Sequence, residues 1–263
     1  MDVLLFDRNN RFVTSKHVDR QALTQFQGTH LALTPGTYRV VCWANISNNT
    51  RTSPLVECET LLEHSYLEMG NISADTIYYA PTKINTFTGK NALSRTEEEG
   101  ILAVADYTDY TMVVPQMGRV VKQMRFVRAY RSIRVYIVGL DMGDDKQPRV
   151  DIAGLSTQYD FLFNTLSLKR DYSLSSRRAI MSDDVTSVAE FFTAFAPITE
   201  NITVSVKDPS GELAYGSVNL RAYLEEFPQA NPDDIEILFE FKGNVMVDIT
   251  LPTWETQPVT PIL

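Results

Sequence analysis

The chain has 263 residues, of which 44% are hydrophobic and 22% charged, and its formal net charge is -9. These totals are those of a soluble globular protein with one large domain or two of about 130 residues. The densest basic segment, residues 119–134, alternates with apolar residues in place of forming a block, so nucleic-acid binding is not expected. No run reaches the ~18 apolar residues that a membrane-spanning helix needs.

Short strands are predicted along the first half of the chain. Residues 3–6 and 12–14 flank the turn DRNN and predict a hairpin. In the next predicted strand, Tyr38, Val40, Cys42 and Ala44 alternate on one apolar face, whereas the opposite face is only half apolar. Further strands are predicted over residues 76–80, 101–105, 110–114, 120–129 and 133–140.

The second half continues the pattern, with strands predicted over residues 159–163, 202–206, 213–215, 235–241 and 245–251. The sequences DPSG (208–211) and KGN (242–244) predict hairpin turns, because Gly and Asn tolerate positive φ. One helix is predicted in NLRAYLEEF, with Asn219 as its N-cap and Pro228 as its stop. Residues 183–195 fit a helix or a strand, and FFTAFAPI favours the strand.

Many short strands separated by turns at regular spacing indicate an all-β protein built from β-sandwiches or barrels. A weak internal echo between DVLLFDRNNRF and TVSVKDPSGEL suggests two of them. The Pro and Gly of residues 115–118 interrupt an apolar stretch, which predicts one domain over residues 1–116 and a second over 117–263.

No catalytic, cofactor or metal site is predicted from the residues. The three histidines, His17, His30 and His64, have no His or Cys partner at ligand spacing. The common nucleophile, zincin and phosphate-loop motifs do not occur, and the acidic pairs lack the spacing of a calcium loop. A pair of catalytic carboxylates brought together by the fold would leave no local trace, so a glycan-acting enzyme stays open as a weaker alternative.

The two cysteines allow two interpretations. Cys42 lies between Val41 and Trp43 on the apolar face of its strand, without the setting of an activated thiol, which favours a free buried thiol. A disulfide between Cys42 and Cys58 is the other interpretation, and it would contribute about 3 kcal/mol in an oxidising compartment.

The start of the chain, MDVLLFD, leads directly into a predicted strand and does not resemble a signal peptide. This indicates a cytoplasmic protein or one whose leader has been removed. The end, TQPVTPIL, is extended in character, which suggests either pairing with a partner or a frayed terminus.

The order of these segments resembles the fimbrillin-associated anchor proteins of Bacteroidales fimbriae. DVLLFDRNNRFV followed by LTPGTYRVVCWANI is similar to the family's opening hairpin and its "L-x-P-G-x-Y-x-V-V-x-W-x-N" strand. TIYYA, VKQMRFVRAYRSIRVYIVGL, LRAYLEEFP and IEILFEFKGNVMVDITLPTWE follow in the family's order, so the resemblance covers essentially the whole chain. The chain departs from the pattern at Cys42, where a small residue such as Ala is common.

The resemblance implies two tandem transthyretin-like β-sandwich domains of Greek-key topology with few short helices. It also implies a non-catalytic structural subunit that anchors a fimbria to the outer membrane or serves as an accessory subunit. Its expected partners are fimbrial subunits, joined by β-strand addition, and the surface-exposed side of the outer membrane, reached through a lipid on an upstream cysteine outside this sequence.

O-glycosylation at Thr76 is a further expectation, because Asp75-Thr76-Ile77 fits the Asp-[Ser/Thr]-apolar tripeptide that the family's phylum modifies. An ordinary strand threonine is the competing interpretation of this residue.

The alternative function is a surface carbohydrate-binding or adhesin module, since tandem sandwiches with exposed aromatic residues are common among glycan binders.

Overall fold

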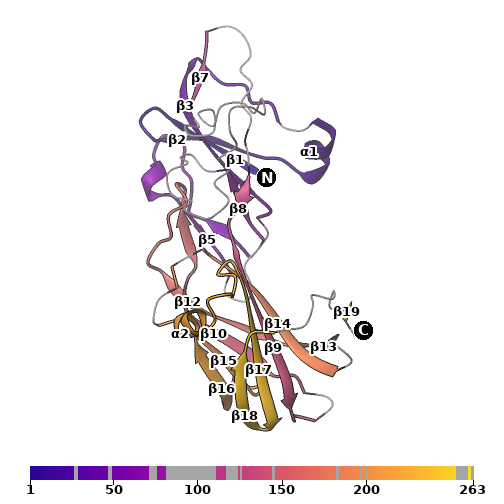
Figure 1. The fold of residues 1–263 in the computed structure, drawn as a ribbon. Helices are drawn as coiled ribbons and strands as arrows, with labels where there is room; N and C mark the ends of the chain where they lie inside the picture. The colour runs from indigo at the N-terminus through magenta and orange to yellow at the C-terminus, as the bar shows by residue number, and fades with distance from the viewer. Residues whose placement is uncertain are drawn as a thin grey trace, which may run out of the picture. The chain divides into compact units, whose positions relative to one another are not determined.

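The computed structural model describes residues 1–26, 29–46, 49–70, 76–80, 111–116, 124, 126–143, 146–181, 184–195, 197–198, 201–252 and 260–261. Strands make up most of this part of the chain, and its helices are short (Figure 1). The chain divides into two compact units. Unit 1 contains Met1–Glu68, Thr76–Ala129 and Tyr159–Asn164, and unit 2 contains Met69–Asp75, Tyr130–Gln158 and Thr165–Leu263. The all-β fold class is confirmed, whereas the domain boundary between residues 116 and 117 stays a prediction.

Unit 1 is built on a sheet in the order β2-β1-β3-β6-β8, with β7 also paired to β3. Its strands are β1 (Asp2–Asp7), β2 (Phe12–His17), β3 (Gly36–Ala44), β6 (Tyr78–Ala80), β7 (Thr111–Val114) and β8 (Val127–Arg128). The predicted hairpin of β1 and β2 is confirmed. Its turn is held by the carboxylate of Asp7, which accepts hydrogen bonds from the backbone N–H groups of Asn9 and Arg11.

The remaining elements of unit 1 lie against this sheet or beside it. A smaller sheet has the order β11-β5-β4. These elements are α1 (Arg20–Phe26), β4 (Arg51–Thr52), the 3-10 helix η1 (Leu62–His64), β5 (Tyr66–Glu68) and β11 (Gln158–Asp160). The sequence did not predict α1, although Asp19 caps it by accepting a hydrogen bond from the N–H of Ala22 at 2.7 Å.

The apolar residues on both faces of β3 are buried. On the half-apolar second face Val41 and Trp43 are each 0% exposed, whereas Arg39 is exposed. Trp43 is covered by a cluster of aromatic rings brought from distant segments: Tyr79 lies 4.7 Å from Trp43, and Phe163 stacks between Tyr79 and Tyr159 at 4.7 Å from each. Such ring pairs stabilise a core beyond the area that they bury.

Unit 2 is a sandwich of two sheets, in the orders β12-β10-β15-β16 and β18-β17-β9-β14-β13-β19. The chain passes from one sheet to the other between β9 and β10, β12 and β13, β14 and β15, and β16 and β17. The strands are β9 (Arg131–Leu140), β10 (Arg149–Ser156), β12 (Lys169–Ser175), β13 (Arg177–Met181), β14 (Asp184–Thr193), β15 (Thr203–Lys207), β16 (Ala214–Asn219), β17 (Asp234–Gly243), β18 (Val245–Thr250) and β19 (Thr260–Pro261).

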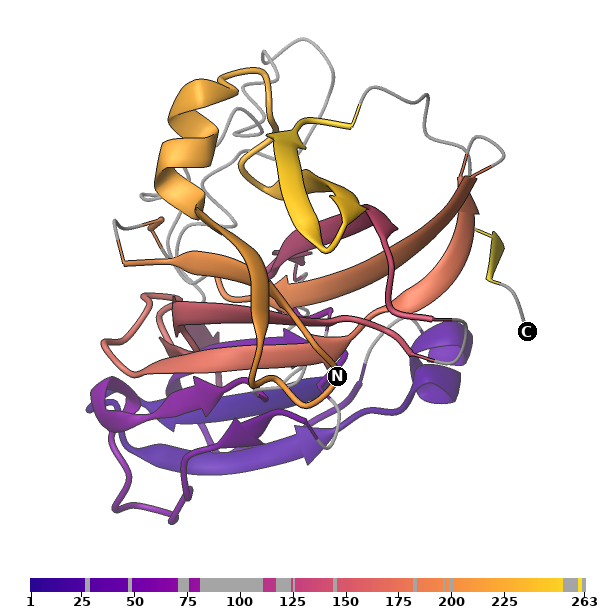
Figure 2. The same ribbon diagram turned by 90° about the horizontal axis from the view of Figure 1, so that it is seen from below.

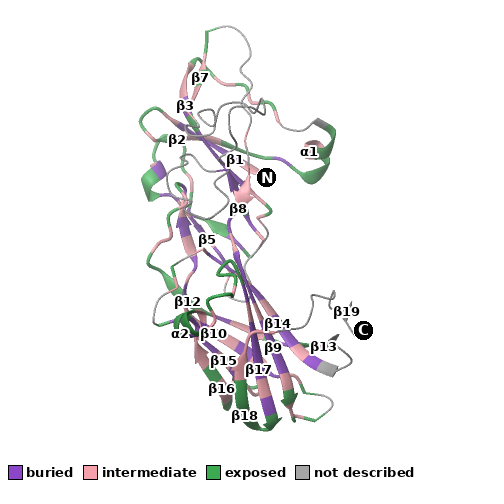
Figure 3. Cartoon of the chain, in the orientation of Figure 1, coloured by how far each residue is buried: buried purple, intermediate pink, exposed green. Residues whose placement is uncertain are grey.

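The core of unit 2 lies between these two sheets. Alternate residues of β9, β14 and β17 point inward from one sheet and meet those of β10 and β15 from the other. The buried residues follow these strands in Figure 3. The core includes Ile133, Val135, Val150, Ile152, Phe191, Val204, Ile235, Ile237 and Phe239. This period-2 burial on both sheets is what makes the unit a β-sandwich.

Several local predictions for unit 2 are confirmed. Helix α2 (Leu220–Glu226) begins at Asn219, whose side chain accepts a hydrogen bond from the N–H of Ala222 at 3.0 Å. Residues 184–193 form a strand and no helix. The DPSG and KGN turns join β15 to β16 and β17 to β18. The predicted strand over residues 101–105, and half of that over 120–129, lie outside the described residues.

A substitution at Gly139 can test the close pairing of β9 with β17. It has φ +74°, and a Cβ atom there would lie 2.1 Å from the carbonyl oxygen of Phe241, whereas Gly143 has φ +78° with open space around it. Both alanine variants strain the backbone, but only Gly139→Ala also forces two strands apart. We expect Gly139→Ala to lower the free energy of unfolding by about 1–3 kcal/mol more than Gly143→Ala, measured by urea denaturation. Equal losses would contradict this account of the pairing.

Candidate functional site

The predicted site residues lie apart from one another in unit 1. Cys42 is buried in β3, and Cys58 is exposed in a turn where its φ is +63°. Neither cysteine is bonded in this structure, and a disulfide between them stays a prediction. The two lie in different settings: Cys42 points into a layer with Val3, Leu5 and Val40, while the turn of Cys58 is fixed on the surface by a hydrogen bond from its N–H to the carbonyl of Phe12.

Thr76 lies two residues before β6 and is partly buried. The side-chain amide of Asn45 donates hydrogen bonds to the Thr76 carbonyl at 2.9 Å and to its hydroxyl oxygen at 2.5 Å. The threonine hydroxyl therefore ties the end of β3 to the start of β6. Asp75, the first residue of the tripeptide, lies outside the described residues, and modification of Thr76 stays a prediction.

An edge of the larger sheet in unit 2 offers a different kind of site. The short strand β19 pairs antiparallel with the outer side of β13, with Ile180 opposite Thr260 and Ala179 opposite Pro261. Figure 2 shows β19 beside this edge, close to the C-terminus. The extended terminus thus pairs with its own chain over two residues. An edge strand is where a further strand can add, because its outer N–H and C=O groups are otherwise open.

The strands behind this edge are joined by a charged cluster on the outer face of the sheet. The guanidinium of Arg134 donates to Glu190 at 2.6 Å and to Glu236 at 2.8 Å, linking β14, β9 and β17. Burial is the largest single effect on the Arg134 guanidinium and disfavours its charge, but the hydrogen bonds and charge interactions with Glu190 and Tyr136 together outweigh it, and the pKa of Arg134 is raised. Burial also raises the pKa of Tyr136, which donates to Glu236, to about 12. Arg134 therefore stays charged and Tyr136 stays neutral throughout the physiological range.

An apolar patch on the same outer face extends to β13. Tyr136, Ala179, Val188 and Leu238 pack together there and are buried, with Val138 partly buried against them. The edge that carries β19 is thus continuous with a firmly packed face of the sheet.

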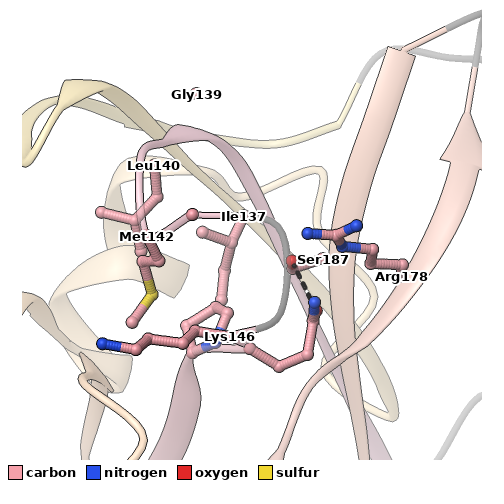
Figure 4. A pocket seen from close by; sticks show the side chains of 10 residues that line it. Ile137, Gly139, Leu140, Met142, Lys146, Arg178 and Ser187 are labelled. Atoms are coloured by element: carbon pink, nitrogen blue, oxygen red, sulfur yellow. Dashed lines mark hydrogen bonds between the residues drawn. The ribbon is translucent and has the colours of Figure 1, made fainter.

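Two adjoining hollows lie at the end of the sandwich where β9 gives way to β10. The first has a volume of about 90 Å3 and is lined by the end of β9, the segment after it, Arg178 and Ser187 (Figure 4). The second has a volume of about 330 Å3, and its described lining residues are Asp141, Met142, Gly143, Lys146, Asp208, Pro209, Leu213 and Tyr215. Met142, Gly143 and Lys146 line both hollows, so the two form one groove.

Sequence reasoning missed Arg178 and the β13 edge. The segment RRAIM is too short for a clear alternation, although two consecutive arginines in a strand must point to opposite faces of the sheet. That rule was the available signal that one of them enters the sandwich. Within the described ranges, no group of three or more His, Cys, Asp or Glu side chains could hold a metal ion. No helix of the same ranges is long and apolar enough to cross a membrane.

Comparison with known proteins identifies the family. The profile of the fimbrillin-A associated anchor proteins Mfa1 and Mfa2 matches residues 1–260. The chain belongs to this family. Family membership confirms the resemblance seen in the sequence, and it gives the chain a fimbrial structural or adhesin-like role with an association to cell-surface fimbriae.

Solved structures share the fold across nearly the whole chain. The fimbrial anchor protein Mfa2 from Porphyromonas gingivalis is 14% identical with a TM-score of 0.57, and the match covers 96% of this chain and 88% of that one. A candidate polysaccharide-binding protein from Bacteroides thetaiotaomicron is 14% identical with a TM-score of 0.60, covering 100% and 89%. A candidate adhesin from Bacteroides ovatus is 14% identical with a TM-score of 0.59, covering 100% and 88%. A search among curated protein sequences finds no match.

The thiols can be distinguished by their reactivity. Burial raises the pKa of Cys42 to about 12, so its thiolate is scarce at neutral pH, whereas Cys58 is exposed. We expect the unreduced protein to contain two titratable thiols when unfolded and only one that reacts rapidly with a maleimide when folded. Mass spectrometry of the labelled Cys58→Ser variant, with Cys42→Ala as its match, assigns the fast site. A count of zero thiols in the unfolded, unreduced chain would support the disulfide interpretation.

Proposed function

We propose that the chain is a non-catalytic subunit that holds a fimbria at the outer membrane, or serves as its accessory subunit, and that it joins fimbrial subunits by β-strand addition at β13. The observation that carries the proposal is the pairing of β19 with this edge. In this pairing the edge already holds a short strand in the plane of the sheet, which supports the proposal. Backbone hydrogen bonds of this kind supply much of the affinity where one subunit completes another's sheet.

The pairing with β19 is short, which makes it exchangeable. It spans two of the five residues of β13, and one of its own two residues, Pro261, has no N–H group to donate. A partner strand that follows all of β13 would form more backbone hydrogen bonds than β19 does. Until then β19 covers part of the edge, and covered edges resist unspecific aggregation.

The membrane attachment is proposed from family membership. The anchor would be a lipid on a cysteine that precedes Met1 in the precursor, and one acyl chain with a second attachment holds a protein firmly at a bilayer. The test is the precursor itself: we expect a signal peptide followed by a lipid-attachment cysteine, and radiolabelled palmitate incorporated into the full-length product in cells. A precursor that has neither feature would overturn the outer-membrane assignment while leaving the strand-addition proposal intact.

A reversible lock tests strand addition. Ile180→Cys with Thr260→Cys, in a background of Cys42→Ala and Cys58→Ser, places two cysteines at directly opposed positions of β13 and β19. Opposed residues of an antiparallel pair lie about 4.5–5.5 Å apart at their Cα atoms, which a disulfide can bridge. We expect the oxidised lock to reduce the fimbrial shaft that co-purifies with the protein about tenfold or more, since the loss of even ~1.4 kcal/mol of binding has that effect. Reduction should restore it.

The matched control introduces a disulfide at the opposite edge of the same sheet. Glu240→Cys with Asp248→Cys joins β17 to β18, which are already a hairpin, and leaves β13 free. We expect this lock to leave the co-purifying shaft unchanged. If the β13–β19 lock also retained all of the shaft, the joining strand would have to bind elsewhere.

A further inference from the structure

The side of unit 2 where β16 and β18 are the outermost strands of the two sheets carries exposed apolar side chains. Val245 is 67% exposed and Val247 57%, and Leu213, directly before β16, is 57% exposed. The two edge strands touch, because a Cβ atom on Gly216 of β16 would lie 2.5 Å from the Met246 sulfur of β18. Figure 3 shows the exposed parts of β16 and β18 lying together. Contiguous exposed apolar side chains mark places where proteins bind partners.

Both edge strands are irregular at this level, which disfavours the addition of a further strand. In β18 the register jumps from Asp248 to Met246, so Val247 is an extra residue without a partner on β17. In β16 Tyr215 is an extra residue in the same way. A bulge twists an edge away from regular pairing and re-aims the side chain that it carries. This side of unit 2 therefore presents side chains, whereas the edge at β13 presents its backbone.

Two carboxylates lie beside the valines on the outer face of the sheet. Glu240 points to this face, because its neighbours Phe239 and Phe241 enter the core. Asp248 of β18 lies directly opposite Glu240. Neither carboxylate forms an ion pair with a residue that the structure describes, and Asp248 accepts a hydrogen bond from the N–H of Ile249 at 2.8 Å. Like charges at opposed positions of a strand pair are destabilising, so this pair lowers the stability of the isolated chain.

Unit 2 itself has no ion pair that offsets these two charges within its described residues. Lys242, opposite Val245, lies beside the pair and forms no ion pair with it. Arg134, further along the sheet, is bonded to Glu190 and Glu236. The residues of unit 2 that the structure does not describe contain no Lys or Arg, so they cannot supply the positive charge.

The combination of side chains distinguishes a binding surface from a protected edge. Charged side chains on an edge strand serve to keep other strands away. Exposed valines have the opposite effect, and here both kinds of side chain share one short strand. An apolar centre bordered by charges is the pattern of a protein–protein interface.

The β16–β18 surface consists of Leu213, Tyr215, Glu240, Val245, Val247 and Asp248. We propose that it binds a protein partner whose apolar contact residues are bordered by Lys or Arg. The partner's apolar side chains cover the valines, and its cations pair with Glu240 and Asp248, which removes the repulsion between the two carboxylates. A second copy of the chain does not fit, because a two-fold interface brings the same patch of both copies together and places carboxylate against carboxylate.

Photo-crosslinking of the full-length protein in cells that carry the fimbria tests the proposal. The probe is Val247→benzoylphenylalanine, and its match is the same substitution of Val56, an exposed valine of unit 1. We expect one defined adduct from the Val247 probe and none of the same mass from the Val56 probe. Mass spectrometry should place the link in a partner segment that contains Lys or Arg.

A charge variant assigns the adduct to the carboxylates. Asp248→Lys reverses one charge and gives Glu240 a partner within the chain, so the adduct yield should fall about tenfold, because a like charge then faces the partner's cation. Its melting temperature should not fall, since a repulsion is removed. The matched control is Glu57→Lys, which makes the same change of net charge at an exposed turn of unit 1 and should keep the yield. Reversal of the partner's nearest basic residue to Glu should restore the adduct of the Asp248→Lys chain.

Four outcomes would overturn the proposal: no adduct from the Val247 probe, an adduct with a second copy of the chain, a partner segment without Lys or Arg, or equal yields from the parent chain and Asp248→Lys. The second outcome would make this surface a contact between copies. None of them bears on strand addition at β13, because the disulfide lock measures shaft retention and leaves the β16–β18 surface unchanged.

Discussion

The pairing of β9 with strands on both of its sides is the constraint on which unit 2 depends. β9 runs antiparallel to β14 from Arg131 to Ile137 and parallel to β17 over nearly its whole length. Its inner residues enter the core, and on its outer face Arg134 bonds both neighbours at once. A parallel pair needs a long connection, and here about a hundred residues separate the two strands. The larger sheet of unit 2 can therefore be completed only after most of the chain has been synthesised.

The end of β9 fixes the place of the groove. At Gly139 the strand takes a left-handed φ and passes so close to Phe241 that only glycine fits. The chain then leaves the sheet, and Met142, Gly143 and Lys146 line both hollows. Because β14 and β13 follow β9 in the sheet, the same strand also sets where Arg178 lies and how far the edge stands from the core.

The sequence was sufficient wherever one local interaction decides the structure. The DPSG and KGN turns and the Asn219 cap act over a few residues, and all appear as predicted. β10 and β12 were missed because their signals are weak. Gly154 interrupts the alternation of β10 at a bulge, and among the residues of β12 only Tyr172 is buried. Both strands are held by partners that lie far away in sequence, and a pattern of single residues does not contain that pairing.

The same limit explains the outcomes at the candidate sites. The aromatic cluster that buries Trp43 takes rings from β6 and from the turn after β11, so the burial of Trp43 depends on partners that the sequence of β3 does not contain. Arg178 has no motif around it. Its placement follows from the alternation of β13 beside β14, which turns it toward a hollow that Met142, Gly143 and Lys146 also line.

β13 presents its backbone and its side chains in perpendicular directions, as every strand does. The N–H and C=O groups of its outer side lie in the plane of the sheet, where β19 pairs with Ala179 and Ile180. The Arg178 side chain stands out of that plane and lines the groove at the end of the sandwich. Exchange of β19 for a partner's strand would therefore change the edge and leave the lining of the groove in place.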